Sequence, residues 1–149
     1  MSPRPRAQTI SIRGKHVAET VDKYMTATPH TIGRKQTLQK AHELMREHGI
    51  RHLPVLDGGK LVGIVSQRDL EMVETLDGVD PGAIAVEEAM TSEPYVVAPL
   101  AKLDETVRVM ARKKFGSAVV ADKGRVVGIF TAVDALAALA WVLDLLDED

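Results

Sequence analysis

The stretch Leu-Pro-Val-Leu-Asp-Gly-Gly-Lys-Leu-Val-Gly-Ile-Val, residues 53–65, decides how the rest of this 149-residue sequence is interpreted. Two nearly all-apolar runs flank the turn sequence Asp57-Gly-Gly-Lys60, and this arrangement predicts a β-hairpin. Because neither run alternates with polar residues, we expect both faces of the hairpin to be covered. Pro54 cannot donate to a ladder and should therefore lie near a strand start or at a sheet edge.

The same pattern recurs 65 residues later as Ala-Val-Val-Ala-Asp-Lys-Gly-Arg-Val-Val-Gly-Ile-Phe, residues 118–130. At this offset residues 21–70 and 86–135 align without a gap, which indicates a duplicated unit. The identical pairs, first copy before second, are Val21 and Val86, Met25 and Met90, Thr26 and Thr91, Pro29 and Pro94, Leu38 and Leu103, Met45 and Met110, Val55 and Val120, Asp57 and Asp122, Gly59 and Gly124, Val62 and Val127, Gly63 and Gly128, Ile64 and Ile129, and Asp69 and Asp134.

Each unit reads as β-α-β-β-α. In the first, a short extended segment follows Pro29, Thr37 is suited to cap a helix that runs to His48, and Gly49 suits its left-handed end. The hairpin then leads into a helix from Ser66 to Leu76. The second unit repeats this order, with a helix near 103–114 and a long final helix over 132–146. One departure is Lys102, which stands where Thr37 caps, so that helix must begin differently.

Composition narrows the classes of function. The net charge is −2 and aromatic residues make up 3%, which favours neither nucleic acid nor an anionic membrane as a partner. Cysteine is absent, which excludes disulfides and thiol catalysis. No signal peptide is evident, and the apolar run 135–143 is too short to span a bilayer, so we expect a cytoplasmic protein. No Gly-x-Ser-x-Gly elbow or other catalytic spacing is present, so we do not expect an enzyme.

Taken together, Met-Thr, Pro, an amphipathic helix, an apolar hairpin with Val-Gly-Ile, and Ser/Thr-x-x-Asp resemble the cystathionine β-synthase (CBS) motif, twice. The resemblance covers roughly residues 16–145. It implies a mixed α/β (α+β) Bateman module whose two motifs pack sheet to sheet about a pseudo-twofold axis and leave two clefts. The expected division is an N-terminal arm over 1–15, motif 1 over 16–76, a linker over 77–85 and motif 2 over 86–146. Such modules commonly form homodimers.

Two Ser/Thr-x-x-Asp pairs, Ser66 with Asp69 and Thr131 with Asp134, have two interpretations. Each matches a capping box, in which hydroxyl and carboxylate satisfy free amides at a helix start. The same helix start also suits a phosphate, and a carboxylate can accept both hydroxyls of a ribose. In CBS modules that bind nucleotides this Asp typically holds the ribose, so the resemblance favours that role for at least one of them. The two interpretations can coexist.

The resemblance further implies composite clefts, in which the Asp of one motif meets the first-strand region of the other. Arg51 and His52 correspond to residues that often face phosphates, whereas the second repeat has Gly116 and Ser117 there, so we expect unequal clefts. The first candidate site, expected to be the better one, comprises Asp134, Thr131, Ser117, Thr26, His30, Arg51 and His52. The second candidate site comprises Asp69, Ser66, Thr91, Tyr95 and Gly116, with Arg51 as a further candidate.

Other features carry weaker expectations. His48 and His52 have a four-residue spacing, but Gly49 should end the helix between them, so we expect no metal site. Arg4, Arg6, Arg13 and Lys15 make the N-terminus basic, and Thr9–Ile12 could add a short strand. The apolar stripe of the last helix fits either its own core or a second subunit. The initiator Met1 favours a complete gene product.

The leading hypothesis is a regulatory module that binds an adenine nucleotide, AMP or ATP, and transmits occupancy to an effector protein by a change of shape. The sequence does not specify the nucleotide, a magnesium requirement or the effector. The alternative is a non-catalytic dimerisation or protein-interaction module without a tightly bound nucleotide, because capping alone explains both aspartates.

Overall fold

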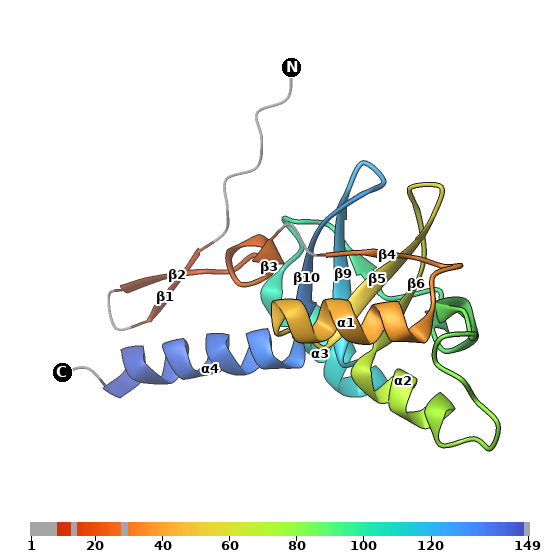
Figure 1. Cartoon of the computed structure of the whole chain (residues 1–149). Coiled ribbons are helices and arrows are strands. Elements are labelled where there is room, and N and C mark those ends of the chain that lie inside the picture. Colours follow the sequence, from red (N-terminus) through yellow and green to blue (C-terminus); the bar gives the residue numbers. More distant parts are fainter. Residues whose placement is uncertain (1–8, 13–14, 28–29, 148–149) are drawn as a thin grey trace. The chain divides into compact units, whose positions relative to one another are not determined.

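The computed structural model describes residues 9–12, 15–27 and 30–147 (Figure 1). They fall into two compact units, unit 1 (residues 1–27, 95–122 and 127–149) and unit 2 (residues 28–94 and 123–126). Each unit is treated by itself below. Pro29 and the arginines of residues 1–8 and 13–14 lie outside the described residues.

Unit 2 is a four-stranded mixed sheet with two α-helices. Its strands follow the order β4-β5-β6-β7, with β4 parallel to β5 and the other pairs antiparallel. The elements are β4 (Ile32–Gly33), α1 (Leu38–His48), β5 (His52–Asp57), β6 (Lys60–Ser66), α2 (Gln67–Glu74), the short 3-10 helix η2 (Val86–Glu88) and β7 (Thr91–Ser92).

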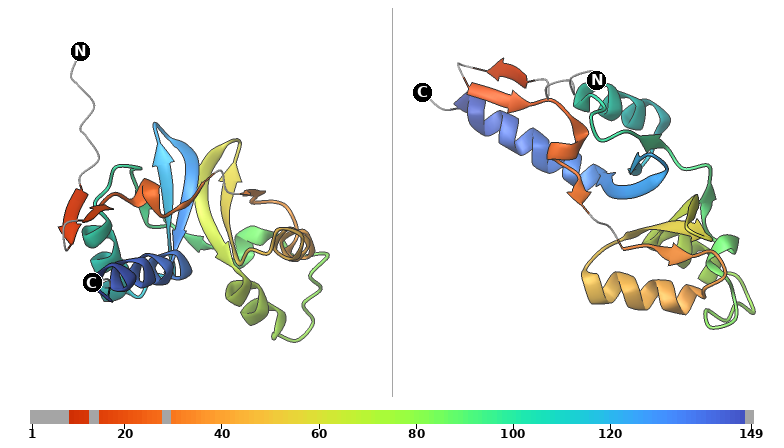
Figure 2. Two further views of the ribbon diagram at one scale, coloured as in Figure 1. Left: turned by 90° about the vertical axis from the view of Figure 1, so that its left-hand side faces the viewer. Right: turned by 90° about the horizontal axis from the view of Figure 1, so that it is seen from above.

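Unit 1 repeats this plan and adds a hairpin. Its four-stranded sheet has the order β3-β10-β9-β8, and β1 pairs with β2 in a separate two-stranded ladder. The elements are β1 (Thr9–Ile12), β2 (Lys15–Ala18), η1 (Val21–Lys23), β3 (Thr26–Ala27), β8 (Val96–Val97), α3 (Leu103–Lys113), β9 (Ser117–Asp122), β10 (Arg125–Thr131) and α4 (Ala132–Asp147). Helix α4 follows β10 without a loop and leads to the C-terminus (Figure 2).

The local predictions from sequence are largely confirmed. The Thr37 hydroxyl accepts from the amide of Lys40 at 3.1 Å, Gly49 ends α1 with a φ of 64°, and the two hairpins form where expected. Lys102 gives α3 no side-chain cap. The strand predicted at Thr9–Ile12 is present as β1. Pro54 lies near the start of β5, one residue before the part of β5 that pairs with β4 at Val55 and Leu56.

The two units do not coincide with the two sequence repeats, because each repeat lends its first segment to the other unit. Strand β3 of the first repeat pairs with β10 of the second, and β7 of the second repeat pairs with β6 of the first. The backbone contacts are equivalent: the Leu103 amide donates to Glu19 O at 2.6 Å, and the Leu38 amide donates to Ile84 O at 3.0 Å. We call residues 19–27 and 84–92 the exchanged segments.

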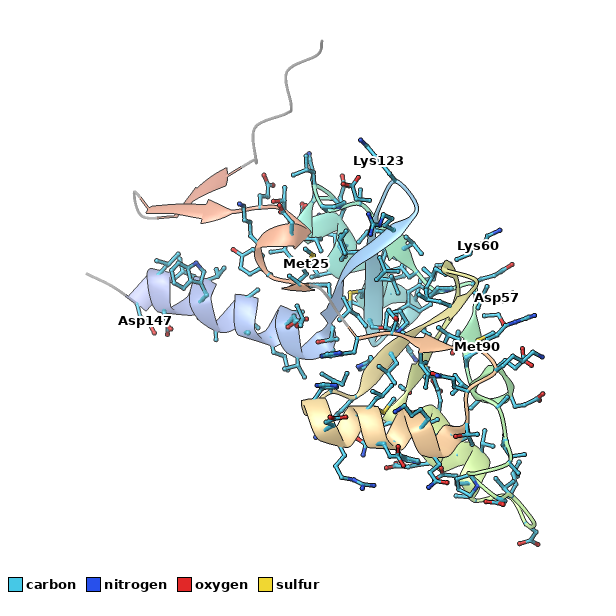
Figure 3. The ribbon with its side chains drawn as sticks, turned by 45° about the horizontal axis from the view of Figure 1, so that its top comes forward. Met25, Asp57, Lys60, Met90, Lys123 and Asp147 are labelled. Carbon is cyan, nitrogen blue, oxygen red and sulfur yellow. The ribbon has the colours of Figure 1, made fainter. Side chains whose placement is uncertain are left out.

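The exchanged segments explain the repeated Val-Gly-Ile sequence. An ideal Cβ on Gly63 would lie 2.5 Å from Met90 Sδ and 2.8 Å from Thr91 O, both on the segment that crosses β6. At Gly128 the same contacts come from Met25 Sδ and, at 3.0 Å, from Thr26 O. Glycine is therefore needed because a neighbouring backbone passes too close for a side chain. Figure 3 labels the two methionines.

Each unit has its own apolar core, closed in part by the exchanged segment. Val86 is fully buried in unit 2 although it belongs to the second repeat, and Val21 is fully buried in unit 1 although it belongs to the first. The buried residues of the unit 2 core are Ile32, Leu38, Ala41, Met45, Leu53, Val55, Val65, Leu70 and Val86. Those of the unit 1 core are Val21, Met110, Ala118, Val120 and Phe130.

The close crossing at Gly63 predicts that Gly63→Ala will lower the free energy of unfolding by about 1–3 kcal/mol, since the new methyl group would displace backbone as well as Met90. Urea denaturation measures the change. Gly33→Ala is the matched control, because its nearest neighbour would be Gln36 Cγ at 3.7 Å, an ordinary contact. Equal stability of the two variants would contradict this role of the crossing.

The uncapped start of α3 predicts that Lys102→Thr will raise the free energy of unfolding by about 1 kcal/mol, because threonine can accept from a free amide of the first turn. The converse change, Thr37→Lys, should lower stability by a similar amount because it removes an existing cap. Both are measured by urea denaturation against the parent chain. A loss of stability in Lys102→Thr would show that the lysine has a structural role of its own.

Candidate functional site

The start of α4 forms the best-defined polar centre of unit 1. Asp134 Oδ2 accepts from the Thr131 amide at 2.9 Å and from the Thr131 hydroxyl at 3.2 Å, while the Asp134 amide lies 3.2 Å from the same hydroxyl oxygen. These bonds satisfy the first turn of the helix in the manner of a capping box. The capping interpretation of this pair is therefore confirmed.

The other carboxylate oxygen of Asp134 faces a residue from the opposite repeat. Thr26, on the exchanged strand β3, donates from its hydroxyl to Asp134 Oδ1 at 3.4 Å. This bond is long compared with the usual O–H···O distance, so a better donor could replace it at small cost. The Asp of the second repeat and the first-strand region of the first repeat thus lie in contact at this pair.

In unit 2 the equivalent centre is the start of α2. The Ser66 hydroxyl oxygen accepts from the Asp69 amide at 3.1 Å, and Asp69 Oδ2 accepts from the Ser66 amide at 2.9 Å, which is a complete capping box. Thr91 belongs to the exchanged strand β7 and pairs with Ile64, two residues before Ser66. Both centres thus use the same backbone plan, with a threonine strand from the other repeat beside the helix start.

Arg51 and His52 lie beside the Ser66 centre within unit 2. His52 is opposite Ser66 in the β5–β6 ladder, and the Arg51 carbonyl accepts from the Gln67 amide at 2.9 Å. Arg51 is exposed and His52 half-buried. In unit 1 the equivalent bond runs from the Ala132 amide to the Gly116 carbonyl at 3.0 Å. Gly116, which has no charge, therefore occupies the same backbone position in unit 1 as Arg51 does in unit 2.

Each unit has one contact between aromatic rings near its candidate residues. The rings of His30 and His48 stack with centroids 3.5 Å apart and planes 11° from parallel. Tyr95, which is the repeat equivalent of His30, packs against Phe115 at 5.5 Å. The sequence did not indicate His48 or Phe115 as neighbours of the candidate residues. Each ring contact joins a residue before a helix to one at or just beyond its end, so it depends on the tertiary fold.

The predicted residues are therefore divided between the units. Unit 1 holds Thr26, Tyr95, Gly116, Ser117, Thr131 and Asp134, of which Thr26, Thr131 and Asp134 are joined by hydrogen bonds. Unit 2 holds His30, Arg51, His52, Ser66, Asp69 and Thr91, of which Ser66 and Asp69 are bonded to each other.

The described residues offer neither a metal-binding cluster nor a membrane-spanning helix. They contain no group of three or more His, Cys, Asp or Glu side chains arranged to hold a metal ion. Among the described helices none is both long enough and apolar enough to cross a bilayer.

A separate cluster of charged residues joins the exchanged segment 84–92 to the residues that follow β4. Glu87 on η2 accepts from Lys35 Nζ at 2.6 Å and lies 3.6 Å from Arg34 Nη1. The hydrogen bond from Lys35 holds the pKa of Glu87 below its ordinary value of 4.5, assisted by the charges of Lys35 and Arg34. Arg34 Nε also lies 3.2 Å from Asp57 Oδ2, in an ion pair without hydrogen-bond geometry.

The paired units with a capped aspartate at each helix start are the architecture of a CBS pair, and comparison with known proteins agrees. The family model for the CBS domain matches residues 21–73 and again 86–140. The chain belongs to the CBS domain family.

Sequence relatives occur both as small proteins and inside a larger enzyme. The chain is 31% identical over 110 residues to the CBS domain-containing protein YhcV of Bacillus subtilis, covering 74% of this chain and 78% of YhcV. It is 39% identical over 105 residues to inosine-5'-monophosphate dehydrogenase of Korarchaeum cryptofilum, covering 70% of this chain and 21% of the dehydrogenase. The chain thus spans about a fifth of that enzyme's length.

Solved structures give the same fold. AcuB from Vibrio cholerae matches with a TM-score of 0.74 and 37% identity, over 87% of this chain and 96% of AcuB. CBSX2 in complex with AMP matches with a TM-score of 0.73 and 28% identity, over 83% and 98% of the two chains. The CBS pair of MJ0100, in complex with 5'-methylthioadenosine and S-adenosyl-L-methionine, matches with a TM-score of 0.74 and 26% identity, over 82% and 96%.

The Glu87 cluster predicts a pH-dependent contribution to stability. A carboxyl whose pKa is lowered by folding stabilises the folded state above its unfolded pKa, and this contribution is lost as pH falls through the folded value. Glu87→Gln should therefore be less stable than the parent at pH 7, and the gap should narrow below about pH 4. Urea denaturation at both pH values measures it. A gap that does not change with pH would contradict the role of the ionised carboxylate.

Proposed function

We propose that the chain is a regulatory module that binds an adenine nucleotide and signals its presence by a change in shape. The observation that carries the proposal is the Asp134 centre, where a carboxylate at a helix start also faces a hydroxyl of the opposite repeat. The complexes of CBSX2 with AMP and of MJ0100 with adenosine compounds support an adenosine ligand in this family.

The chemistry of the centre suits a ribose. One oxygen of Asp134 accepts from the Thr131 amide, and among the described residues the other accepts only the long bond from Thr26. Each carboxylate oxygen has two acceptor sites, so two vicinal hydroxyls could bind without breaking the cap. A ribose hydroxyl at ordinary distance would replace the 3.4 Å bond of Thr26.

Phosphate binding would fall to the cations of the first candidate site. Arg51 has a permanent, planar charge suited to phosphate oxygens, and His52 adds charge near its reference pKa of about 6.5. Their counterparts Gly116 and Ser117 have no charge. We therefore propose that the first candidate site, with Asp134, binds a phosphorylated adenosine more tightly than the second, with Asp69.

Signalling would require no catalysis. A ligand that contacts residues of both repeats shifts the arrangement of the module only as far as it binds one arrangement better than another. We propose that the chain is not itself an enzyme, that it acts in the cytoplasm on an effector protein, and that it does so as a homodimer.

The second candidate function is an interaction module with no tightly bound nucleotide. One observation favours it: both aspartates already have a complete structural role as capping residues. Under this hypothesis dimerisation alone would regulate a partner protein.

Calorimetric titration of AMP and ATP tests the proposal. We expect Asp134→Ala to weaken nucleotide binding by at least about tenfold, the loss expected for one or two hydrogen bonds to a charged acceptor. Asp69→Ala is the matched control, since it removes the same capping contact at the other helix start. It should cost similar stability in the absence of nucleotide and have the smaller effect on affinity.

A thermal-shift screen with AMP, ADP, ATP, S-adenosylmethionine and NAD distinguishes the two functions, because a ligand that binds only the folded chain raises its stability. No shift with any of them at millimolar concentration would leave the interaction module as the better hypothesis. Equal losses of affinity in the two aspartate variants would refute the inequality of the sites.

A further inference from the structure

A methionine sulfur lies at each of the two places where an exchanged segment passes over a glycine, which we call the crossings. Met90 Sδ lies against Gly63, where an ideal Cβ would come within 2.5 Å of it, and Met25 Sδ lies against Gly128 in the same way. Each methionine also packs against the apolar core of its own unit. The sulfur therefore fills the space beside the glycine, and that side of it has no room for another atom.

The methionines of the chain differ in their exposure to solvent. Cysteine is absent, so methionine supplies the only sulfur atoms open to oxidation. Met72 on α2 is 62% exposed, Met45 and Met110 are each 5% exposed, and Met25 and Met90 are half-buried. Of the described methionines, only those at the crossings therefore combine partial access to solvent with a place in the packing.

Oxidation by a peroxide would change the contact at a crossing. A sulfur lone pair attacks one oxygen of hydrogen peroxide, and the O–O bond breaks. The proton of the attacked oxygen passes to the leaving hydroxide, which becomes water, so the sulfur loses two electrons and the peroxide gains them. The product, methionine sulfoxide, places a polar oxygen on a side chain that is packed against backbone and apolar groups, which is unfavourable without a hydrogen-bond partner.

The end of each exchanged segment is held by little pairing. Strands β3 and β7 are two residues long, and Thr26 and Thr91, which directly follow the two methionines, are exposed. A short terminal pairing of this kind opens locally at a lower free-energy cost than unfolding of the whole unit. Local opening would therefore expose the sulfur while the rest of the unit stays folded.

We propose that Met25 and Met90 are oxidation sites, and that their sulfoxides release the exchanged segments from the crossing glycines. Thr26 directly follows Met25, and its hydroxyl reaches Asp134 across the repeats. Thr91 follows Met90 in the same way. Release of either segment therefore removes the threonine strand from a helix start. Oxidation and nucleotide binding are measured separately, so either can fail without the other.

The two crossings differ in how their segments are fastened. Glu87 of segment 84–92 pairs with Lys35 and lies close to Arg34. Its counterpart in segment 19–27, Asp22, accepts at 2.5 Å from the hydroxyl of Thr20 in the same segment. The counterparts of Arg34 and Lys35 are a proline and a leucine, at positions 99 and 100. The ion pairs of Glu87 therefore offer a way to loosen one crossing without changing either methionine.

Treatment of the full chain with hydrogen peroxide, followed by peptide mass spectrometry, tests access to the sulfurs. Met72 should be oxidised first, Met25 and Met90 next, and Met45 and Met110 last, because exposure falls in that order. Stability in urea should fall as the crossing methionines react and not as Met72 reacts. If Met25 and Met90 were protected as well as Met45 and Met110, the proposal would be overturned.

An oxidation-resistant variant tests the consequence. In Met25→Leu with Met90→Leu, leucine fills a similar volume and has no sulfur. Peroxide should lower the midpoint of urea denaturation of the parent and leave that of this variant unchanged. Met72→Leu is the matched control: it removes the most exposed of the described sulfurs but no crossing contact, so peroxide should destabilise it as it does the parent. An equal loss in the parent and the double variant would contradict the proposal.

A further test keeps both methionines in place. Glu87→Gln should raise the rate of Met90 oxidation by about twofold to fivefold, the range that loss of an exposed ion pair allows, and leave the rate at Met25 unchanged. Asp104→Asn is the matched control, because it removes the ion pair with Arg108 within α3. It should leave the Met90 rate unchanged. A Met90 rate that Glu87→Gln does not alter would show that the sulfur reacts without opening of the crossing, and would overturn the release.

Discussion

The close passage of a Met-Thr strand over a glycine is the contact on which the rest of the fold depends. It occurs twice, at Gly63 under Met90-Thr91 and at Gly128 under Met25-Thr26. Because each strand comes from the other repeat, neither unit is complete with its own repeat alone. The same exchange buries Val21 and Val86 in the core of the unit they join. Each unit therefore needs a segment of both repeats to complete its sheet and its core.

The exchange also determines how polar groups are brought to the helix starts. Thr26 reaches Asp134 only because β3 is hydrogen-bonded to β10 of the other repeat. A capping carboxylate is engaged on one oxygen, and its other oxygen remains directed at a strand that arrives from elsewhere in the sequence. Structural and binding roles are compatible here because a carboxylate has more acceptor sites than one helix start requires.

Differences between the repeats are as informative as their identity. Lys102 replaces a capping threonine, Gly116 replaces Arg51, and α4 is twice as long as α2. Each difference lies outside the buried core, where substitution is constrained least by packing. The crossing glycines and the methionines above them are identical in the two repeats. Several core positions are not, since Leu53 corresponds to Ala118 and Val65 to Phe130, so the repeats share the crossing more closely than the packing of the two cores.

Much of this protein was determined by its sequence alone. The hairpins, the caps at Thr37 and Ser66 and the turn at Gly49 follow from local chemistry. A repeat with a constant offset indicated the duplication, and the resemblance of its motifs indicated the CBS pair. Tertiary structure decided what local chemistry cannot: which repeat supplies β3 and β7, that His30 stacks on His48, and that the leucines of α4 except Leu145 face outward. These features depend on contacts between residues far apart in the chain, and an apolar stripe has the same period whether it faces a core or a partner. The sequence could therefore predict a stripe on the last helix, and only the fold could show which of its leucines remained exposed.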